Sequence, residues 1–342
     1  MVESPLEVSL PPVSRRSAIG MIAGALLLPS GIATVPVRAR ADIAAFQAWL
    51  TEFKSEAMAQ GISPATLDAA FFNVFGPIER VIELDRSQPE SRLTLDEYLV
   101  KVVSIQRIEK GRTLLAENRV LLDSIGAKFG VQPRFIVALW GIETDYGRVT
   151  GGYSVIGSLA TLAYEGRRAD FFRSELLQAL WIVQEGHIDP YNMTGSWAGA
   201  MGQSQFMPSS FNAYAFDYDG DGRRDIWGTL PDVFASIANY LASFNWRGDQ
   251  TWGREVRAPS GLDPNLLSLD VNRSLQEWQA LGVRNLDGSA LPDRPLSASL
   301  IYPGDGPRAF LVYENFKTIL KWNRSSYFGV AVGQLADGIG PG

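Results

Sequence analysis

The sequence of 342 residues contains no cysteine and only one histidine, His187. Without cysteine, a disulfide framework, a thiolate metal site and a cysteine nucleophile are excluded, and we expect no lipid anchor on an N-terminal cysteine. A single histidine excludes a multi-histidine zinc site and argues against a Ser-His-Asp triad. Basic residues do not outnumber acidic ones: 31 against 37 give a net charge of −6. We therefore expect no nucleic-acid partner.

Long apolar runs are scarce as well. The run 18–28 near the N-terminus is far shorter than the roughly 20 residues that a membrane-spanning helix needs. Arg15 and Arg16 precede this run, and a small-residue cleavage pattern, Ala39-Arg40-Ala41, follows it. This order predicts a secretory signal peptide over 1–41, and the paired arginines resemble a twin-arginine signal. We expect a soluble, exported, periplasmic protein without a transmembrane segment; a buried N-terminal helix is the alternative.

The remaining sequence divides into three segments that differ in the spacing of their apolar residues. Apolar residues recur at helical spacing over 42–246, which predicts a helical domain. Over 247–313, short apolar runs alternate with turn residues, which predicts a small antiparallel β-rich subdomain. Helical spacing returns over 314–342 and predicts a return to the helical domain. We therefore expect an α+β protein that is mainly α, with a small β subdomain inserted late.

Glu143 is the most informative ionisable residue of the sequence. It ends a strongly apolar helix predicted to begin at Pro133. Burial, a helix C-terminus and the like charge of Asp145 would each raise the pKa of the carboxyl group. Such a group can keep its proton near neutral pH and serve as a general acid. The alternative is a structural ion pair at the helix end, with Arg148 as the partner.

A second segment, 195–210, has the sequence GSWAGAMGQSQFMPSS and is rich in small and amide residues. Small residues let the backbone approach a ligand closely, and amides can hydrogen-bond hydroxyl groups. A tight packing loop is the alternative interpretation. The pattern is compatible with a ligand groove near Glu143.

Segments 141–148, GIETDYGR, and 195–210 together closely resemble the membrane-bound lytic murein transglycosylase B family. The matches at 239–240, 321–325 and 331–335 extend the resemblance over 42–335. It implies a lysozyme-like fold and cleavage of the β-1,4 bond between N-acetylmuramic acid and N-acetylglucosamine in peptidoglycan, with a 1,6-anhydro product. Glu143 matches the single glutamate that acts first as acid and then as base.

Two other functions stay open at this stage. A muramidase would hydrolyse the same bond, with Asp145 as the second carboxylate that most glycosidases need. A non-enzymatic glycan-binding protein could use the same fold. The resemblance implies glycan strands of peptidoglycan as the partner, with other cell-wall enzymes as further candidates.

The resemblance also implies a set of groove residues. Trp322 stands where relatives often carry tyrosine, and either ring can stack on a sugar face. Arg167 and Arg168 match an arginine pair that contacts glycan or peptide stem. The full set of expected substrate-binding residues is Tyr98, Arg167, Arg168, Ser196, Gln205, Tyr240, Trp322 and Asn323.

An acidic segment, 217–232, resembles an EF-hand calcium loop with the pattern D-x-D-x-D-G. The twelfth position, where an EF-hand has a bidentate glutamate, is Gly228, and Asp232 can supply the missing carboxylate. The expected ligands of a structural Ca²⁺ or Na⁺ are Asp217, Asp219, Asp221, the Arg223 carbonyl, Asp225 and Asp232. An uncomplexed turn neutralised by Arg223 and Arg224 is the alternative. We expect no cofactor for catalysis.

Overall fold

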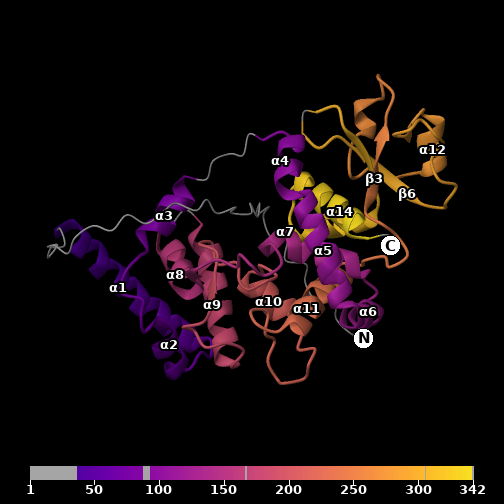
Figure 1. Cartoon of the computed structure of the whole chain (residues 1–342). Helices are drawn as coiled ribbons and strands as arrows, with labels where there is room; N and C mark the ends of the chain where they lie inside the picture. Colours follow the sequence, from indigo (N-terminus) through magenta and orange to yellow (C-terminus); the bar gives the residue numbers. More distant parts are fainter. Residues whose placement is uncertain (1–36, 88–92, 166–167, 305, 341–342) are drawn as a thin grey trace, which may run out of the picture. The chain divides into compact units, whose positions relative to one another are not determined.

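The computed structural model describes residues 37–87, 93–165, 168–304 and 306–340 (Figure 1). Residues 1–36 of the predicted signal peptide lie outside the described residues, and Arg167 does too. The described chain forms two compact units. One unit holds the residues up to Thr251 together with those from Ala331 onward, and the other runs from Trp252 to Val330.

The first unit is helical. Its elements are α1 (Val37–Ala59), α2 (Pro64–Phe71), α3 (Glu79–Arg86), α4 (Leu95–Val102), α5 (Ile105–Glu117), α6 (Arg119–Phe129), α7 (Pro133–Thr144), α8 (Val155–Glu165), α9 (Ala169–Gln184), α10 (Pro208–Tyr214) and α11 (Leu230–Ser243). Two short strands, β1 (Tyr153–Ser154) and β2 (Thr194–Gly195), pair antiparallel. Helix α1 begins at Val37, before the predicted cleavage point.

Local sequence signals set several helix boundaries. The Ser63 hydroxyl accepts the backbone N–H of Thr66 at the start of α2, and Pro64 occupies the first turn. Thr94 and Glu97 form a capping box at the start of α4. Gly130, at φ 69°, ends α6 in the left-handed conformation that glycine adopts without strain.

Helix α7 is the core helix of this unit. Its side chains from Phe135 to Leu139 are fully buried, and it packs against α5, α6 and α11. A helix that is apolar on all sides is stable only when it is covered on all sides. The apolar helix predicted from the sequence is confirmed, and its last turn carries Glu143.

The second unit is built on one five-stranded sheet with the strand order β4-β6-β7-β3-β5, in which every pairing is antiparallel. The strands are β3 (Gly253–Arg257), β4 (Arg273–Ser274), β5 (Arg284–Asn285), β6 (Ser297–Ile301) and β7 (Ala309–Val312). In the central pair, Leu300 of β6 lies opposite Leu311 of β7. Two short helices, η1 (Pro264–Leu266) and α12 (Leu275–Ala280), lie between strands in the sequence.

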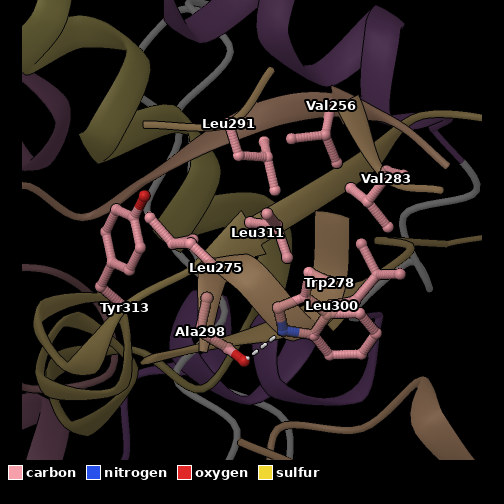
Figure 2. Packing of buried hydrophobic residues seen from close by; sticks show 10 residues of the cluster. Val256, Leu275, Trp278, Val283, Leu291, Ala298, Leu300, Leu311 and Tyr313 are labelled. Carbon is pink, nitrogen blue, oxygen red and sulfur yellow. Dashed lines mark hydrogen bonds between the residues drawn. The ribbon is translucent and has the colours of Figure 1, made fainter. Parts of the chain in front are cut away.

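A compact apolar cluster forms the core of this unit (Figure 2). Trp278 of α12 is fully buried there, and its indole N–H donates to the carbonyl of Ala298 at 2.8 Å. The unit extends to Val330, beyond Tyr313, where the sequence prediction ended the β-rich subdomain. It includes α13 (Glu314–Trp322), because Phe316 packs on Trp252 beside β3, with ring centroids 6.1 Å apart. Helix α14 (Ser326–Ile339) begins in this unit.

The predicted fold class, mainly helical with a small antiparallel β subdomain, is confirmed. Among the described helices, none combines the length and the apolar character needed to cross a membrane.

Candidate active site

Glu143 is the penultimate residue of α7 and is half-buried. The chain reverses directly after it. Asp145 and Tyr146 adopt positive φ angles of 50° and 61°, and Gly147 follows at 78°. Consecutive left-handed residues that are not glycine cost free energy, so they persist only where surrounding contacts hold them. The contacts of this turn therefore decide where Glu143 lies.

Helix α5 holds the turn from one side. The Tyr146 hydroxyl donates to the carbonyl of Arg107 at 2.6 Å, and the Lys110 ammonium donates to the carbonyl of Asp145 at 3.1 Å. The Tyr146 ring lies so close to Gly141 that a Cβ atom at this position would come within 2.6 Å of it. Gly141 lies one helical turn before the point where the chain reverses. This close approach requires a glycine there.

Asp145 is held in ion pairs. Its carboxylate accepts the guanidinium of Arg148 at 2.6 Å and lies 3.7 Å from that of Arg107. Arg148, the partner that the alternative interpretation assigned to Glu143, thus pairs with Asp145. The carboxylate of Asp145 is thus engaged by two cations, which makes it a poor second carboxylate for glycoside hydrolysis.

Gln203 holds the end of α7 from the other side. Its side-chain oxygen accepts the indole N–H of Trp140 at 2.8 Å, and its backbone carbonyl accepts the Thr144 hydroxyl at 2.9 Å. Its side-chain amide donates to the carbonyl of Trp227 at 2.9 Å. Gln203 therefore joins the residues on both sides of Glu143 to a third segment of the chain.

The loop 195–206 folds tightly on itself. The Ala200 backbone N–H donates to the Ser196 hydroxyl at 3.0 Å, and the Ser196 N–H donates to the Ala200 carbonyl at 2.7 Å. Gly151 approaches this loop so closely that a Cβ atom would lie 2.1 Å from the Gly195 carbonyl oxygen. The hydroxyl of Ser196 is thus fixed in position, and the side chain is half-buried.

Gln205, the second amide of this loop, has a strained backbone with φ 50°. Its side-chain N–H₂ donates to the carbonyls of Thr150 at 3.0 Å and Gly202 at 2.9 Å. These bonds hold the strained conformation and orient the side chain. A strained residue held in this way is a frequent feature of functional sites.

Tyr98 on α4 lies within electrostatic reach of Glu143. Burial raises the pKa of the Tyr98 hydroxyl to about 12, the Glu143 carboxylate adds to the rise, and the Arg107 guanidinium opposes it. The hydroxyl is therefore a neutral group over the physiological range. Tyr98 is thus an expected groove residue that is electrostatically linked to Glu143.

Arg168 and Tyr240, two further expected groove residues of the helical unit, contact other side chains of the protein. The Arg168 guanidinium lies 3.4 Å from the carboxylate of Asp85 and stacks over the Phe172 ring. Tyr240 is only 3% exposed and packs against Tyr214 and Phe244, among other rings. Its contact with a substrate stays a prediction.

Two of the expected groove residues belong to the other compact unit. Trp322 ends α13 and is 2% exposed, and Asn323 accepts the backbone N–H of Ser325 at 3.0 Å. Their membership of a groove with Glu143 stays a prediction.

The acidic loop brings three carboxylates together. Oxygen atoms of Asp217, Asp219 and Asp221 all lie within 4.8 Å of one another. The loop turns at Gly220 and Gly222, whose N–H groups donate to the Asp217 carboxylate at 2.7 and 2.9 Å. Hard oxygen ligands on a tight loop suit Ca²⁺.

Asp225 and Asp232 face the backbone of the loop. The Asp225 carboxylate accepts the N–H groups of Trp227 and Gly228 at 2.8 and 2.9 Å. Asp232 is fully buried, and its two oxygens accept the N–H groups of Tyr218 at 2.7 Å and Asp225 at 2.8 Å. Burial raises the pKa of Asp232, and these hydrogen bonds lower it. Both residues brace the loop, and their roles as metal ligands stay predictions.

Sequence reasoning gave no positioning role to Gln203, Tyr146 or Arg107. In the sequence, Gln203 is one of the amide residues of the segment 195–210, and its hydrogen bond with Trp140 depends on tertiary contact. The dipeptide Tyr146-Gly147 after an apolar helix offered a weak signal of a turn. No local pattern indicates that the carbonyl of Arg107 receives the Tyr146 hydroxyl.

The chain is similar to known proteins over most of its length. The family model described as the transglycosylase SLT domain matches residues 45–337. "Membrane-bound lytic murein transglycosylase B" of Escherichia coli (strain K12) is 34% identical over 250 residues, 71% of this chain. The match covers 66% of that protein, just under two thirds of its length.

Solved structures resemble this chain over most of its length. SltB3 from Pseudomonas aeruginosa, in complex with NAG-anhNAM-pentapeptide, is 46% identical with a TM-score of 0.82. The match covers 85% of this chain and 78% of SltB3. The Escherichia coli lytic transglycosylase Slt35, in complex with calcium, is 27% identical with a TM-score of 0.72. That match covers 86% of this chain and 92% of Slt35.

Proposed function

Because the chain belongs to the transglycosylase SLT domain family, we propose that it is a peptidoglycan lytic transglycosylase. It cleaves the β-1,4 bond between N-acetylmuramic acid and N-acetylglucosamine and leaves a 1,6-anhydro-N-acetylmuramic acid end. The observation that carries this proposal is the position of Glu143 in the last turn of the buried helix α7, whose end is held by contacts of Gln203 and Tyr146. Asp145, two residues further on, is paired with Arg148 and Arg107.

The reaction needs one carboxyl group. Glu143 protonates the glycosidic oxygen as the bond from that oxygen to C1 of the muramic acid breaks. The N-acetyl group of the same sugar stabilises the positive charge that develops at C1. The Glu143 carboxylate then accepts the proton of the C6 hydroxyl, whose oxygen bonds to C1 and closes the anhydro ring. Glu143 ends the cycle protonated, as it began.

A hydrolase would need a second carboxylate or an activated water on the other side of the sugar. The described contacts of Asp145 oppose such a role, because its carboxylate already accepts the Arg148 guanidinium at 2.6 Å. The ligand NAG-anhNAM-pentapeptide in the SltB3 structure contains an anhydro sugar by its printed name, which supports the lytic over the hydrolytic reaction.

The groove residues hold the sugars by hydrogen bonds and ring contacts. The neutral hydroxyl of Tyr98 and the fixed side chains of Ser196 and Gln205 are the donors and acceptors we assign to this task. Arg168 keeps its predicted contact with glycan or peptide stem. Arg167 keeps the same predicted contact, and Tyr240, Trp322 and Asn323 keep their predicted places in the substrate groove.

The loop with Asp217, Asp219 and Asp221 binds a structural Ca²⁺ in this proposal. The three clustered carboxylates fit such an ion, and the Slt35 structure in complex with calcium supports it. When bound, the ion would neutralise the carboxylates and rigidify the loop, and it takes no part in the reaction. A signal peptide and periplasmic action complete the proposal, since peptidoglycan lies outside the cytoplasm.

Mass spectrometry of soluble products tests the proposal. The mature protein and Glu143→Gln are incubated separately with purified peptidoglycan. We expect anhydro-muropeptides from the wild type and none from the variant. Muropeptides with a free reducing end would make the protein a muramidase, and equal products from both proteins would remove Glu143 from the mechanism.

A further inference from the structure

A cavity of about 720 Å³ lies in the helical unit, and none of its lining residues has a place in the site described above. Its walls come from the end of α2 and the loop after it, from the start of α8, and from the loop before β2. The side chains that matter here are Asp68, Phe72, Asn73, Asp189 and Tyr191. The volume falls within the range of small-ligand sites.

The cavity gathers exposed aromatic rings. Among the described residues, three aromatic side chains are highly exposed: Phe72 at 75%, Phe75 at 70% and Tyr191 at 80%. Phe72 and Tyr191 both line this cavity, although they come from distant parts of the sequence, and Phe75 lies in the same loop as Phe72. Large exposed apolar side chains that cluster around a cavity mark binding sites.

Hydrogen bonds hold these walls in place. The side chain of Gln47 on α1 donates to the carbonyl of Phe75 at 2.8 Å, and the Thr161 hydroxyl on α8 accepts the N–H of Ile78 at 2.9 Å. On the opposite wall, the Asp189 carboxylate accepts the N–H of Tyr191 at 2.8 Å. The rings are therefore exposed on an ordered frame, which favours a preformed site.

The charge of the cavity has one sign. Its described lining contains two carboxylates, Asp68 and Asp189, and no lysine, arginine or histidine. Asp68 is exposed, and it has no ion pair or side-chain hydrogen bond within the part of the chain that the structure describes. Carboxylates beside open aromatic faces are complementary to a cation, which gains both ionic and cation–π attraction.

We propose that this cavity binds the ammonium group of an amine-bearing peptide stem on the peptidoglycan substrate. The inference rests on the proposed function for the identity of the peptide. Asp68 and Asp189 face the ammonium group, and the rings of Phe72 and Tyr191 cover the alkyl chain that carries it. An amide cross-link consumes such an amine and its charge, so the cavity discriminates free stems from cross-linked ones.

Calorimetry with a soluble disaccharide-peptide tests this proposal. The peptide is used with its side-chain amine free and with that amine acetylated, and every protein carries Glu143→Gln so that no turnover occurs. We expect acetylation to weaken binding about tenfold. Asp68→Asn should weaken binding of the free-amine form and leave the acetylated form unchanged, whereas Tyr191→Ala should weaken binding of both forms, because both keep the alkyl chain that the ring covers. Asp249→Asn, at an exposed aspartate outside the cavity, is the matched control.

The proposal is overturned if acetylation leaves the affinity unchanged, or if Asp68→Asn binds the free amine as the control does. It is also overturned if peptide-free glycan binds and loses affinity in Tyr191→Ala, because the cavity would then take sugar. Turnover of peptide-free glycan by Asp68→Asn, without Glu143→Gln, is measured separately and should match the wild type. A wild type without turnover would refute the proposed function, whereas the binding comparison would still decide the cavity.

Discussion

The indole N–H of Trp140 donates to the side-chain oxygen of Gln203 at 2.8 Å, one turn before Glu143 on the same helix. Gln203 also accepts the Thr144 hydroxyl, one residue after Glu143, through its backbone carbonyl. The position of Glu143 thus depends on a residue 60 positions away in the sequence. This relationship leads to the first prediction.

Gln203→Leu should lower both stability and turnover. The leucine removes the acceptor of the Trp140 N–H and the donor to the Trp227 carbonyl, and an unsatisfied buried polar group costs about 1–3 kcal/mol. Because the variant leaves Glu143 in place but loosens its support, kcat should fall more than KM changes. Urea unfolding and steady-state kinetics measure the two effects.

The exposed Gln60, directly after α1, offers a matched control, since its side chain bonds only to Glu56 near the end of α1 among the contacts described. Gln60→Leu should keep the wild-type kcat. A Gln203→Leu variant with wild-type kcat at intact stability would remove Gln203 from the support of Glu143.

The two carboxylates at the end of α7 should respond differently to neutralisation. Glu143→Gln should lose roughly 10²–10⁴-fold or more in turnover, because it removes the general acid. Asp145→Asn should keep most of the turnover and lose stability, because it breaks the ion pairs with Arg148 and Arg107. Kinetics and thermal unfolding of both variants check this contrast.

A similar loss of turnover in both variants, with both folds intact, would speak for a two-carboxylate mechanism. Reducing-end analysis of the residual products would then distinguish hydrolysis from anhydro-ring formation.

Stability at alkaline pH should depend on Tyr98. Burial first, and the Glu143 carboxylate second, raise the pKa of Tyr98 to about 12, above the ordinary value of 10.0. The unfolded chain therefore releases this proton at lower pH than the folded chain. The stabilisation is fully present below pH 10 and is lost as the pH rises from 10 to 12, by up to about 2 kcal/mol.

Urea unfolding of the wild type and Tyr98→Phe at pH 8, 10, 11 and 12 measures this effect. At pH 8, the difference in the free energy of unfolding between the wild type and Tyr98→Phe gives the cost of the missing hydroxyl alone. Above pH 10, the variant should lose less stability than the wild type. Parallel curves for the two proteins across this range would contradict the prediction.

The acidic loop should make thermal stability depend on calcium. A site at 100-fold excess of Ca²⁺ over its Kd adds about 2.7 kcal/mol, so a chelator should lower the Tm by several degrees. Asp217→Asn should abolish that dependence, because Asp217 belongs to the cluster of three carboxylates. Differential scanning calorimetry with Ca²⁺ or EDTA is the measurement.

Asp232 should behave differently from Asp217. Its buried carboxylate accepts the N–H groups of Tyr218 and Asp225, so Asp232→Asn should destabilise the protein even in EDTA, by about 1–3 kcal/mol. If Asp232→Asn leaves the stability in EDTA unchanged and abolishes the stabilisation by Ca²⁺, then Asp232 is a metal ligand and does not merely support the loop.

Local sequence signals were sufficient for several parts of the fold. The apolar run from Pro133 predicted α7 because a helix without a polar side must be buried, and Phe135 to Leu139 are. Turn residues predicted the β-rich segment that forms β6 and β7. The D-x-D-x-D-G pattern predicted the carboxylate cluster, because its three aspartates lie within one short loop.

By itself, the sequence determined which residue is the candidate acid, which family motifs surround it and where helix gives way to strand, since each depends on neighbours along the chain. Only the tertiary structure decided that α13 packs with the sheet, that Gln203 and Tyr146 brace the end of α7, and that Asp145 is paired with two arginines. It also brought Phe72 and Tyr191 to one cavity. These features depend on contacts between segments far apart in sequence, whose pairing is set by packing of the whole unit rather than by any local pattern.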